Sequence, residues 1–219
     1  MLSRWSRWAP LTGVIFAGLA AAGTAVGTSW SNDTPSSNTS GAQVIAFYEA
    51  HRSGQRTGDI LVALAFVFFL FFVGSLRAHL RQARAAEPLS AVMLAGAVVF
   101  TIGMTLLAGL DFALADVPHD LSAAAAQALN VLNNDLVFPS LVGLAVFGLA
   151  SGLAILRGAP LPRWLGWVAI AIGIAAVTPA TPLARLAIAI WTIIVSVLIC
   201  LRSDAGVAAA SVGAVEPRA

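Results

Sequence analysis

Residues 60–76 read ILVALAFVFFLFFVGSL, a run of seventeen residues without a charged side chain. A transmembrane helix needs about 20 mainly apolar residues, with ~17–25 the usual range. Because lipid offers the backbone no hydrogen-bonding partners, so long an apolar run predicts a helix that crosses a membrane. Five more stretches approach this length. The six predicted spans are residues 10–29, 60–76, 89–110, 136–156, 164–178 and 183–201.

The overall composition agrees with this prediction. Of the 219 residues, 59% are hydrophobic and 10% are charged, and the mean hydropathy is +0.89. A soluble domain carries about 25% charged residues, so the composition excludes a soluble globular enzyme. We predict an all-α fold, a polytopic transmembrane helix bundle of six spans with short outer helices, over residues 10–202. Residues 1–9 are then a cytoplasmic N-terminal segment, and residues 203–219 a disordered cytoplasmic tail.

The arginines set the expected orientation. All twelve basic residues are Arg. With the N-terminus inside, eight of them lie on the cytoplasmic side and three outside, with the distal Arg218 left out, as the positive-inside rule requires. Both termini are then cytoplasmic. The alternative for the first span is a cleaved signal peptide, but its apolar core exceeds the usual ~7–15 residues.

Two outer segments carry helix signals. Ser40 and Gln43 have the spacing of a capping box, and apolar residues follow at helical spacing over 44–51, which predicts a short amphipathic helix. A second outer helix is expected around residues 121–132, with Asp120 as its N-cap. Residues 31–40, rich in Ser, Thr and Asn, have the composition of a flexible linker.

Acidic residues gather on the side opposite to the arginines, where seven of the ten lie. Carboxylates beside an imidazole can bind a divalent cation or relay protons. The alternative is that they solubilise an outer loop and cap its helices. The candidate outer polar or ion cluster consists of Asp111, Asp116, His119, Asp120, Asn134 and Asp135.

Within this cluster Asp111 and Asp135 matter most, because they lie at the ends of predicted spans. Arg185, near the outer end of the last span, is a candidate ion-pair partner for either of them. Alternatively, its side chain extends to lipid phosphates. Neither a metal nor a cofactor is assigned from these residues.

The span interiors carry two further patterns. The second span holds Phe66, Phe68, Phe69, Phe71 and Phe72 without a helical stripe, so we expect most of these rings to face lipid. Trp191 lies mid-span and is expected to pack inside the bundle. Two Gly-x-x-x-Gly pairs place small residues on one helix face, which permits close helix contact; incidental glycines in a Gly/Ala-rich chain are the alternative. The pairs are Gly23 with Gly27 and Gly148 with Gly152.

Patterns of catalysis are missing from the sequence. It contains no GxSxG, no HExxH and no GxGxxG. The single Cys200 excludes an internal disulfide and a CxxC redox pair. The pI near 9.5 reflects topology-setting arginines, so no nucleic-acid partner is expected. The sequence therefore favours a protein that is not an enzyme.

Three segments together resemble a known group of proteins. They are PLTG at 10–13, VIAFYEAHR at 44–52 and RGAPLPRWLGW at 157–167. In combination they resemble small actinobacterial integral membrane proteins that share a domain of unknown function. The likeness extends over most of the chain, and LPRWLG at 161–166 is its most distinctive part. The resemblance implies a bacterial membrane protein and assigns no catalytic residue.

These observations lead to two functional hypotheses. The first is a non-enzymatic, multi-pass protein of the bacterial inner membrane. Its partners are the lipid bilayer and either further copies of itself or another membrane protein, which it would contact through small-residue helix faces. The alternative is a small proton- or cation-coupled transport protein that uses the outer acidic cluster.

Overall fold

The computed structural model describes residues 9–27 and 34–213, and within these ranges the chain forms helices and no strand. The all-α prediction is confirmed. The α-helices are α2 (Thr12–Val26), α3 (Gly41–Leu80), α4 (Glu87–Asp116), α5 (Ala123–Asp135), α6 (Val137–Leu156), α7 (Arg163–Ala176) and α8 (Thr181–Gly213). Three short 3-10 turns are η1 (Ala9–Leu11), η2 (Arg84–Ala86) and η3 (Pro118–Asp120).

Four helical segments of the described chain, not six, are long and apolar enough to cross a membrane. They are Gly41–Leu80, Arg84–Asp116, Ala123–Leu156 and Leu183–Arg202. The predicted number of spans is therefore wrong by this criterion. Helices α2 and α7 have 15 and 14 residues. At 1.5 Å per residue each is about 21–23 Å long, shorter than a hydrocarbon core of about 30 Å.

The short outer helix predicted after Ser40 is not a separate element. It continues into the second predicted span as α3, which has 40 residues and no proline to interrupt it. The predicted capping box at its start is confirmed, with the Ser40 backbone N–H donating to Gln43 Oε1 over 3.3 Å. Helix α3 is about 60 Å long, so it extends well beyond one hydrocarbon core.

Two other predicted boundaries differ from the structure. The N-cap of α5 is Ser122, whose hydroxyl accepts from the Ala125 N–H over 3.2 Å, and Asp120 lies in the preceding turn η3. Helix α8 continues to Gly213, where a disordered tail was predicted; its last turns are rich in Ala, the residue of highest helix propensity. Residues 1–8 and 214–219 of the predicted terminal segments lie outside the described residues.

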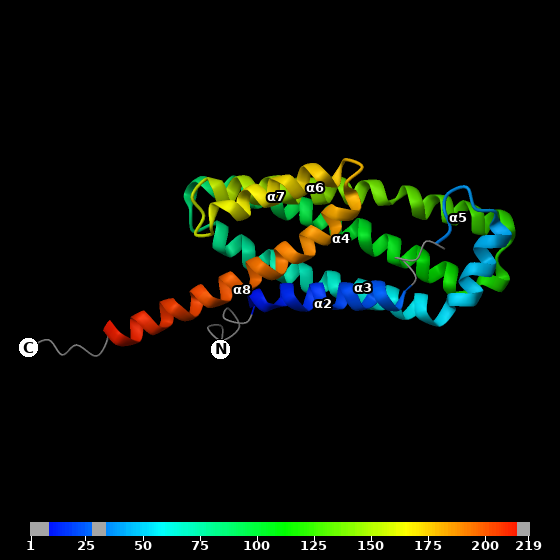
Figure 1. The fold of residues 1–219 in the computed structure, drawn as a ribbon, viewed down its shortest axis with the longest axis horizontal. Coiled ribbons are helices and arrows are strands. Elements are labelled where there is room, and N and C mark those ends of the chain that lie inside the picture. The colour runs from blue at the N-terminus through cyan, green and yellow to red at the C-terminus, as the bar shows by residue number, and fades with distance from the viewer. Residues whose placement is uncertain (1–8, 28–33, 214–219) are drawn as a thin grey trace, which may run out of the picture.

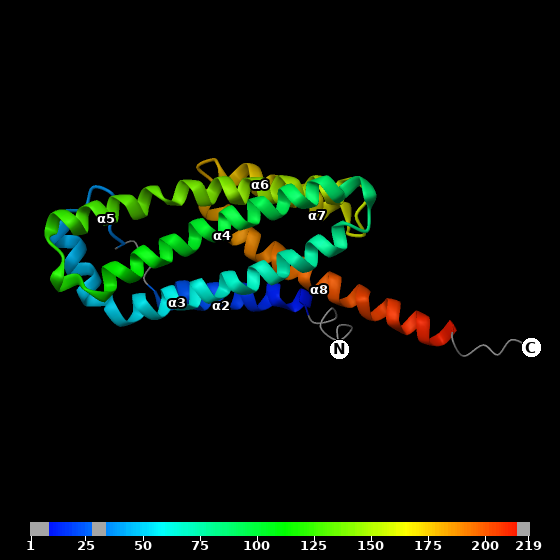
Figure 2. The same ribbon diagram turned by 180° about the vertical axis from the view of Figure 1, so that it is seen from behind.

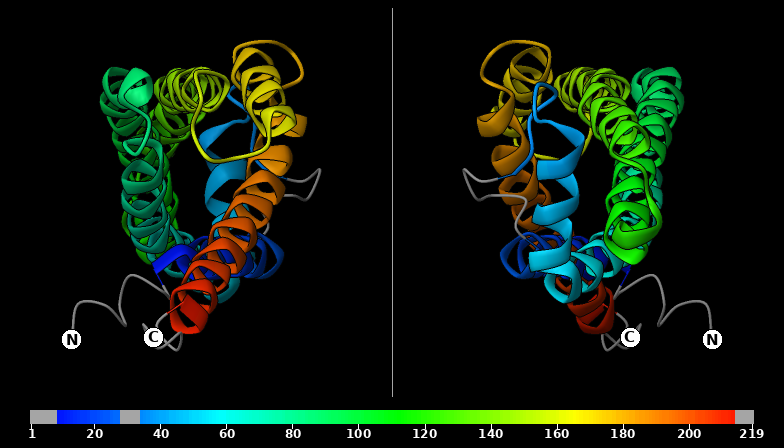
Figure 3. Two further views of the ribbon diagram at one scale, coloured as in Figure 1. Left: turned by 90° about the vertical axis from the view of Figure 1, so that its left-hand side faces the viewer. Right: turned by 90° about the vertical axis from the view of Figure 1, so that its right-hand side faces the viewer.

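The helices form a ring around the long axis of the molecule. Successive contacts join α3 to α4, α4 to α6, α6 to α7, α7 to α8, α8 to α2 and α2 to α3. Figure 3 shows this ring end-on. The α3–α4 and α6–α7 turns lie at one end of the bundle, and α5 lies at the other (Figures 1 and 2). Arginines 77, 81, 84, 157 and 163 flank the two turns, so the structure separates a basic end from an acidic end.

An aromatic layer fills the middle of the bundle. Phe66, Phe69 and Phe72 of α3 are 3%, 0% and 0% exposed, so the expectation that most rings of this span face lipid is wrong for these three. They recur every three residues and form a stripe that faces the core. Phe69 contacts the rings of Phe100 and Phe147 at centroid distances of 5.7 and 5.5 Å.

Trp191 packs beside this layer, as predicted. It is 1% exposed, and its indole N–H donates to the carbonyl oxygen of Leu165 over 3.0 Å. This bond joins α8 to α7 and satisfies the one polar group of a buried side chain.

The glycine pairs lie in contacts between helices of the same chain. A methyl group added at Gly23 would stand 2.8 Å from the carbonyl oxygen of Gly58, so α2 and α3 touch backbone to backbone. At Gly148 it would stand 2.7 Å from the carbonyl oxygen of Ala169, and at Gly152 2.5 Å from that of Gly166. These small-residue faces are therefore used inside one molecule, between α2 and α3 and between α6 and α7.

Candidate functional site

One face of α3 carries the polar residues of the acidic end. Tyr48, Gln55 and Asp59 are spaced by seven and four residues, which places them on one side of a helix with 3.6 residues per turn. All three are buried, at 2%, 3% and 6% exposure. The unbroken helix α3 thus holds a row of polar groups against α4 and α5.

Asp111 on α4 is the centre of a hydrogen-bonded network. The Tyr48 hydroxyl donates to Asp111 Oδ1 over 2.5 Å, and Asn133 Nδ2 of α5 donates to the same oxygen over 2.8 Å. Three helices thus converge on one carboxyl oxygen. Burial disfavours a charge on Asp111, and the two donors offset part of that cost because hydrogen bonds to a carboxylate favour its ionised form.

Asp59 is less well satisfied. Gln55 Nε2 donates to its Oδ1 over 3.3 Å, and its Oδ2 is buried without a hydrogen-bond partner among the described residues. The charge of Asp111 acts on Asp59, so the two carboxyl groups form an electrostatically coupled pair. An unpartnered, buried carboxylate is costly, which marks Asp59 as a candidate functional residue.

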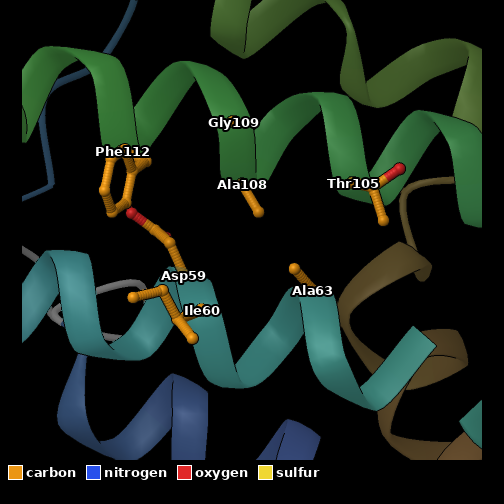
Figure 4. Close-up of a pocket in the computed structure, with 7 residues that line it drawn as sticks. All are labelled: Asp59, Ile60, Ala63, Thr105, Ala108, Gly109 and Phe112. Carbon is orange, nitrogen blue, oxygen red and sulfur yellow. The ribbon is translucent and has the colours of Figure 1, made fainter. Parts of the chain in front are cut away.

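A pocket of about 150 Å³ lies beside Asp59, between α3 and α4. Figure 4 shows the Asp59 side chain extending from α3 toward Phe112 on α4. The lining residues are Asp59, Ile60, Ala63, Thr105, Ala108, Gly109 and Phe112. Only Asp59 and Thr105 contribute a side-chain oxygen, and Thr105 Oγ1 donates to the carbonyl oxygen of Thr101 over 2.8 Å.

Two arginines of α3 contact the C-terminal end of α4. Arg56 forms an ion pair with Asp116 over 3.2 Å, and its guanidinium lies 5.1 Å from the centre of the Phe112 ring. Arg52 donates to the backbone carbonyl of Asp116. Asp116, one of the predicted site residues, is therefore linked to α3 through Arg52 and Arg56. The ion pair is more than two-fifths exposed on both sides, so it contributes little to stability.

The remaining residues of the predicted cluster are dispersed. His119 Nδ1 lies 3.0 Å from Glu49 Oε1 at the surface, and Asp120 and Asp135 are exposed. Asn134 donates to the carbonyl oxygens of Asn130 and Pro35 over 2.8 and 3.4 Å. Six residues predicted as one cluster therefore divide among several contacts, and only Asp111 is part of the buried network.

The loop before α3 lies against α5. Asn130 Nδ2 donates to the carbonyl oxygen of Ser36 over 2.8 Å, in addition to the contact between Asn134 and Pro35. Two residues of the predicted linker, Pro35 and Ser36, therefore contact α5, and its residues 31–33 lie outside the described part of the chain.

Arg185 pairs with neither predicted partner. It forms no ion pair within the part of the chain that the structure describes, and its Nε is buried without a hydrogen-bond acceptor. Helix α8 packs mainly on α7 and α2, whereas Asp111 and Asp135 end α4 and α5, which explains the separation.

No group of three or more His, Cys, Asp or Glu residues among the described side chains could hold a metal ion. A divalent cation in an all-protein site takes six or more oxygen ligands at short range. The dispersed acids do not supply such a set, so the divalent-cation hypothesis gains no support from the geometry.

Sequence reasoning missed Asp59, Tyr48 and Gln55. Asp59 was the last residue of an outer loop in the predicted topology, one position before the span at 60–76. Their common helical face is visible in the sequence only if α3 is recognised as continuous. The spacing 48, 55, 59 was the signal that could have found them.

Comparison with protein families, with curated proteins and with solved structures finds no match. The resemblance to the actinobacterial membrane proteins therefore remains a prediction.

Proposed function

We propose that this chain is a multi-pass protein of a bacterial inner membrane, with the basic end of the bundle in the cytoplasm. Both termini then lie in the cytoplasm, provided that the short helices α2 and α7 also cross the membrane. Four apolar helices of sufficient length support the membrane assignment. The basic end of the bundle, at the α3–α4 and α6–α7 turns, supports the orientation by the positive-inside rule.

We further propose that the protein binds a proton or a small cation at the pair formed by Asp59 and Asp111, as a coupled transport protein does. The single observation that carries this proposal is the buried Asp59 Oδ2 atom, which has no partner among the described residues and borders a pocket. A bound proton or cation would neutralise it. Ionisable groups inside membrane bundles commonly mark ion pathways and proton relays.

The aromatic layer lies between the Asp59 pocket and the basic end, so transport would require a movement of the helices that carry it. Phe66 and Phe69 on α3, with Phe100 on α4, pack edge to face between the acidic end and the basic end. These rings are apolar and buried, so they separate the Asp59 pocket from the basic end of the bundle. Coupled transport would need α3 and α4 to separate or rotate at this layer.

Assembly through the Gly-x-x-x-Gly faces has weaker support. Gly148 and Gly152 contact α7, and Gly23 contacts α3, all within one chain. These faces are already covered, and no other observation favours a second copy.

The orientation is tested by cysteine labelling in whole cells. Cys200→Ser removes the single native thiol, and Asp120→Cys or Arg84→Cys then places one thiol at the acidic or the basic end. A membrane-impermeant maleimide should label the first variant and not the second. Labelling of Arg84→Cys alone would show that the basic end faces outward, opposite to the proposed orientation.

Transport through this site is tested in proteoliposomes. Vesicles containing the purified protein should acidify under an inside-negative potassium diffusion potential, or take up radioactive sodium or potassium ions. Asp59→Asn should lose the flux, and Asp135→Asn, a change of the same chemistry at an exposed position, should retain it. Vesicles that move none of these ions above a protein-free control would refute transport through this site.

A further inference from the structure

The surroundings of Asp59 indicate which ligand the site takes, and this inference rests on the proposed function. The pocket lining offers two side-chain oxygens, from Asp59 and Thr105, among aliphatic and aromatic groups. The Thr105 hydroxyl bonds to its own helix. Magnesium and calcium ions take six or more oxygen ligands, so water would have to supply most of the shell of such a cation in a lining that is otherwise apolar.

Charged groups around Asp59 leave its carboxyl without compensation. On α3, Arg56 is paired with Asp116 at the surface. On α4, Asp111 adds a like charge, and on α5 the nearest contributor to the network is the neutral Asn133. Helix α2 approaches at this level through Gly23 and Gly27, which touch Gly58 and carry no titratable group.

The two carboxyl groups also differ in their donors. Asp111 accepts from Tyr48 and Asn133, whereas among the described residues Asp59 accepts from Gln55 alone, over 3.3 Å. Donors favour an ionised carboxylate, and burial without donors favours the neutral acid. When two coupled carboxyl groups share one proton, the proton therefore resides on Asp59.

We propose that the ligand of this site is a proton, carried on Oδ2 of Asp59 next to the pocket between α3 and α4. Binding transfers one proton from water to this oxygen, and release returns it. No other bond forms or breaks. The neutral acid no longer repels Asp111, and its new O–H can donate a hydrogen bond into the pocket.

The test uses an apolar carbodiimide on the purified full-length chain in lipid vesicles. This reagent adds its whole mass to a protonated carboxyl group, and peptide mass spectrometry locates the adduct. We expect labelling at Asp59 that falls about tenfold per pH unit above the pH at which the group ionises. Sodium, potassium and magnesium chlorides in large excess should leave the labelling unchanged.

Three results would overturn the inference. Protection of Asp59 by sodium or potassium would show that a metal cation occupies the site, which leaves the proposed function standing. An adduct on Asp111 alone would show that the proton resides on Asp111 and not on Asp59. No adduct on Asp59 at any pH, in protein whose Asp111 and Asp135 peptides are detected, would show that Asp59 does not carry a proton.

Two variants separate these outcomes from misfolding. Asp59→Asn keeps the shape of the neutral acid, so it should remain folded and lose the adduct at this position. Asp135→Asn should be labelled at Asp59 as the wild type is. A failure of proton flux with normal Asp59 labelling would refute transport and leave the proton site in place.

Discussion

The hydrogen bond between Tyr48 and Asp111 offers the sharpest test of the buried network. Tyr48→Phe removes a hydroxyl that is buried and donates to Asp111 Oδ1 over 2.5 Å. A hydrogen bond to a charged group contributes about 1.5–3 kcal/mol, and a neutral one about 0.5–1.5 kcal/mol. We therefore expect Tyr48→Phe to lower the free energy of unfolding by about 2 kcal/mol in the wild type and about 1 kcal/mol in Asp111→Asn.

The measurement is a double-mutant cycle, with reversible unfolding in mixed micelles followed by circular dichroism. The expected coupling between the two positions is about 1 kcal/mol. Asn134→Ala is the matched comparison. Its effect on the free energy of unfolding should add to that of Asp111→Asn, because Asn134 donates to the backbone carbonyls of Asn130 and Pro35. Equal losses for Tyr48→Phe in both backgrounds would show that the network is not centred on the charge of Asp111.

Three further predictions concern packing and the loop before α3. Gly143→Ala should lower the unfolding temperature in detergent, because the added methyl would meet the Phe100 backbone N at 2.3 Å, whereas Gly109→Ala, in open space, should raise it. Phe69→Ala should cost about 3–5 kcal/mol of unfolding free energy, and truncation of Phe138, which is 65% exposed, should cost much less in the same assay. Asn130→Ala should release the loop before α3 and speed its cleavage in limited proteolysis; an unchanged cleavage rate would contradict the docked loop.

The helical nature of the chain could be predicted from the sequence, but the extent of each helix could not. Apolar runs such as residues 60–76 identify segments that need lipid or protein around them. They do not reveal that α3 begins at Gly41, because the polar residues between 49 and 59 lower the hydropathy without breaking the helix. Conversely, residues 10–29 were apolar enough for a span, although Pro10 lies in η1 and Gly27 ends α2.

The site was predicted only in part, for a related reason. Asp111 was identified because it ends an apolar run. Asp116, Asp120 and Asp135 have the same residue type and nearly the same place in the chain, yet they point to arginines or to solvent. Sequence position gives the end of the bundle on which a carboxylate lies. Whether it faces inward depends on helix rotation, which packing decides: the glycine contacts at Gly58 and Gly103 set how α3 and α4 are turned.

The length of α3 explains why an acidic pair can exist in so apolar a chain. A helix of about 60 Å is roughly twice the thickness of the hydrocarbon core, so the acidic end projects beyond the lipid tails when the aromatic layer lies within them. Gly58 contacts Gly23 and Gly27 at the end of α2, which places Asp59 at the level where that short helix ends. Asp111 and Tyr48 lie on the acidic side of that level and are joined by a hydrogen bond. Asp59 thus stands between the buried hydrogen-bonded network of Tyr48 and Asp111 and the apolar aromatic core, beside the pocket that separates α3 from α4.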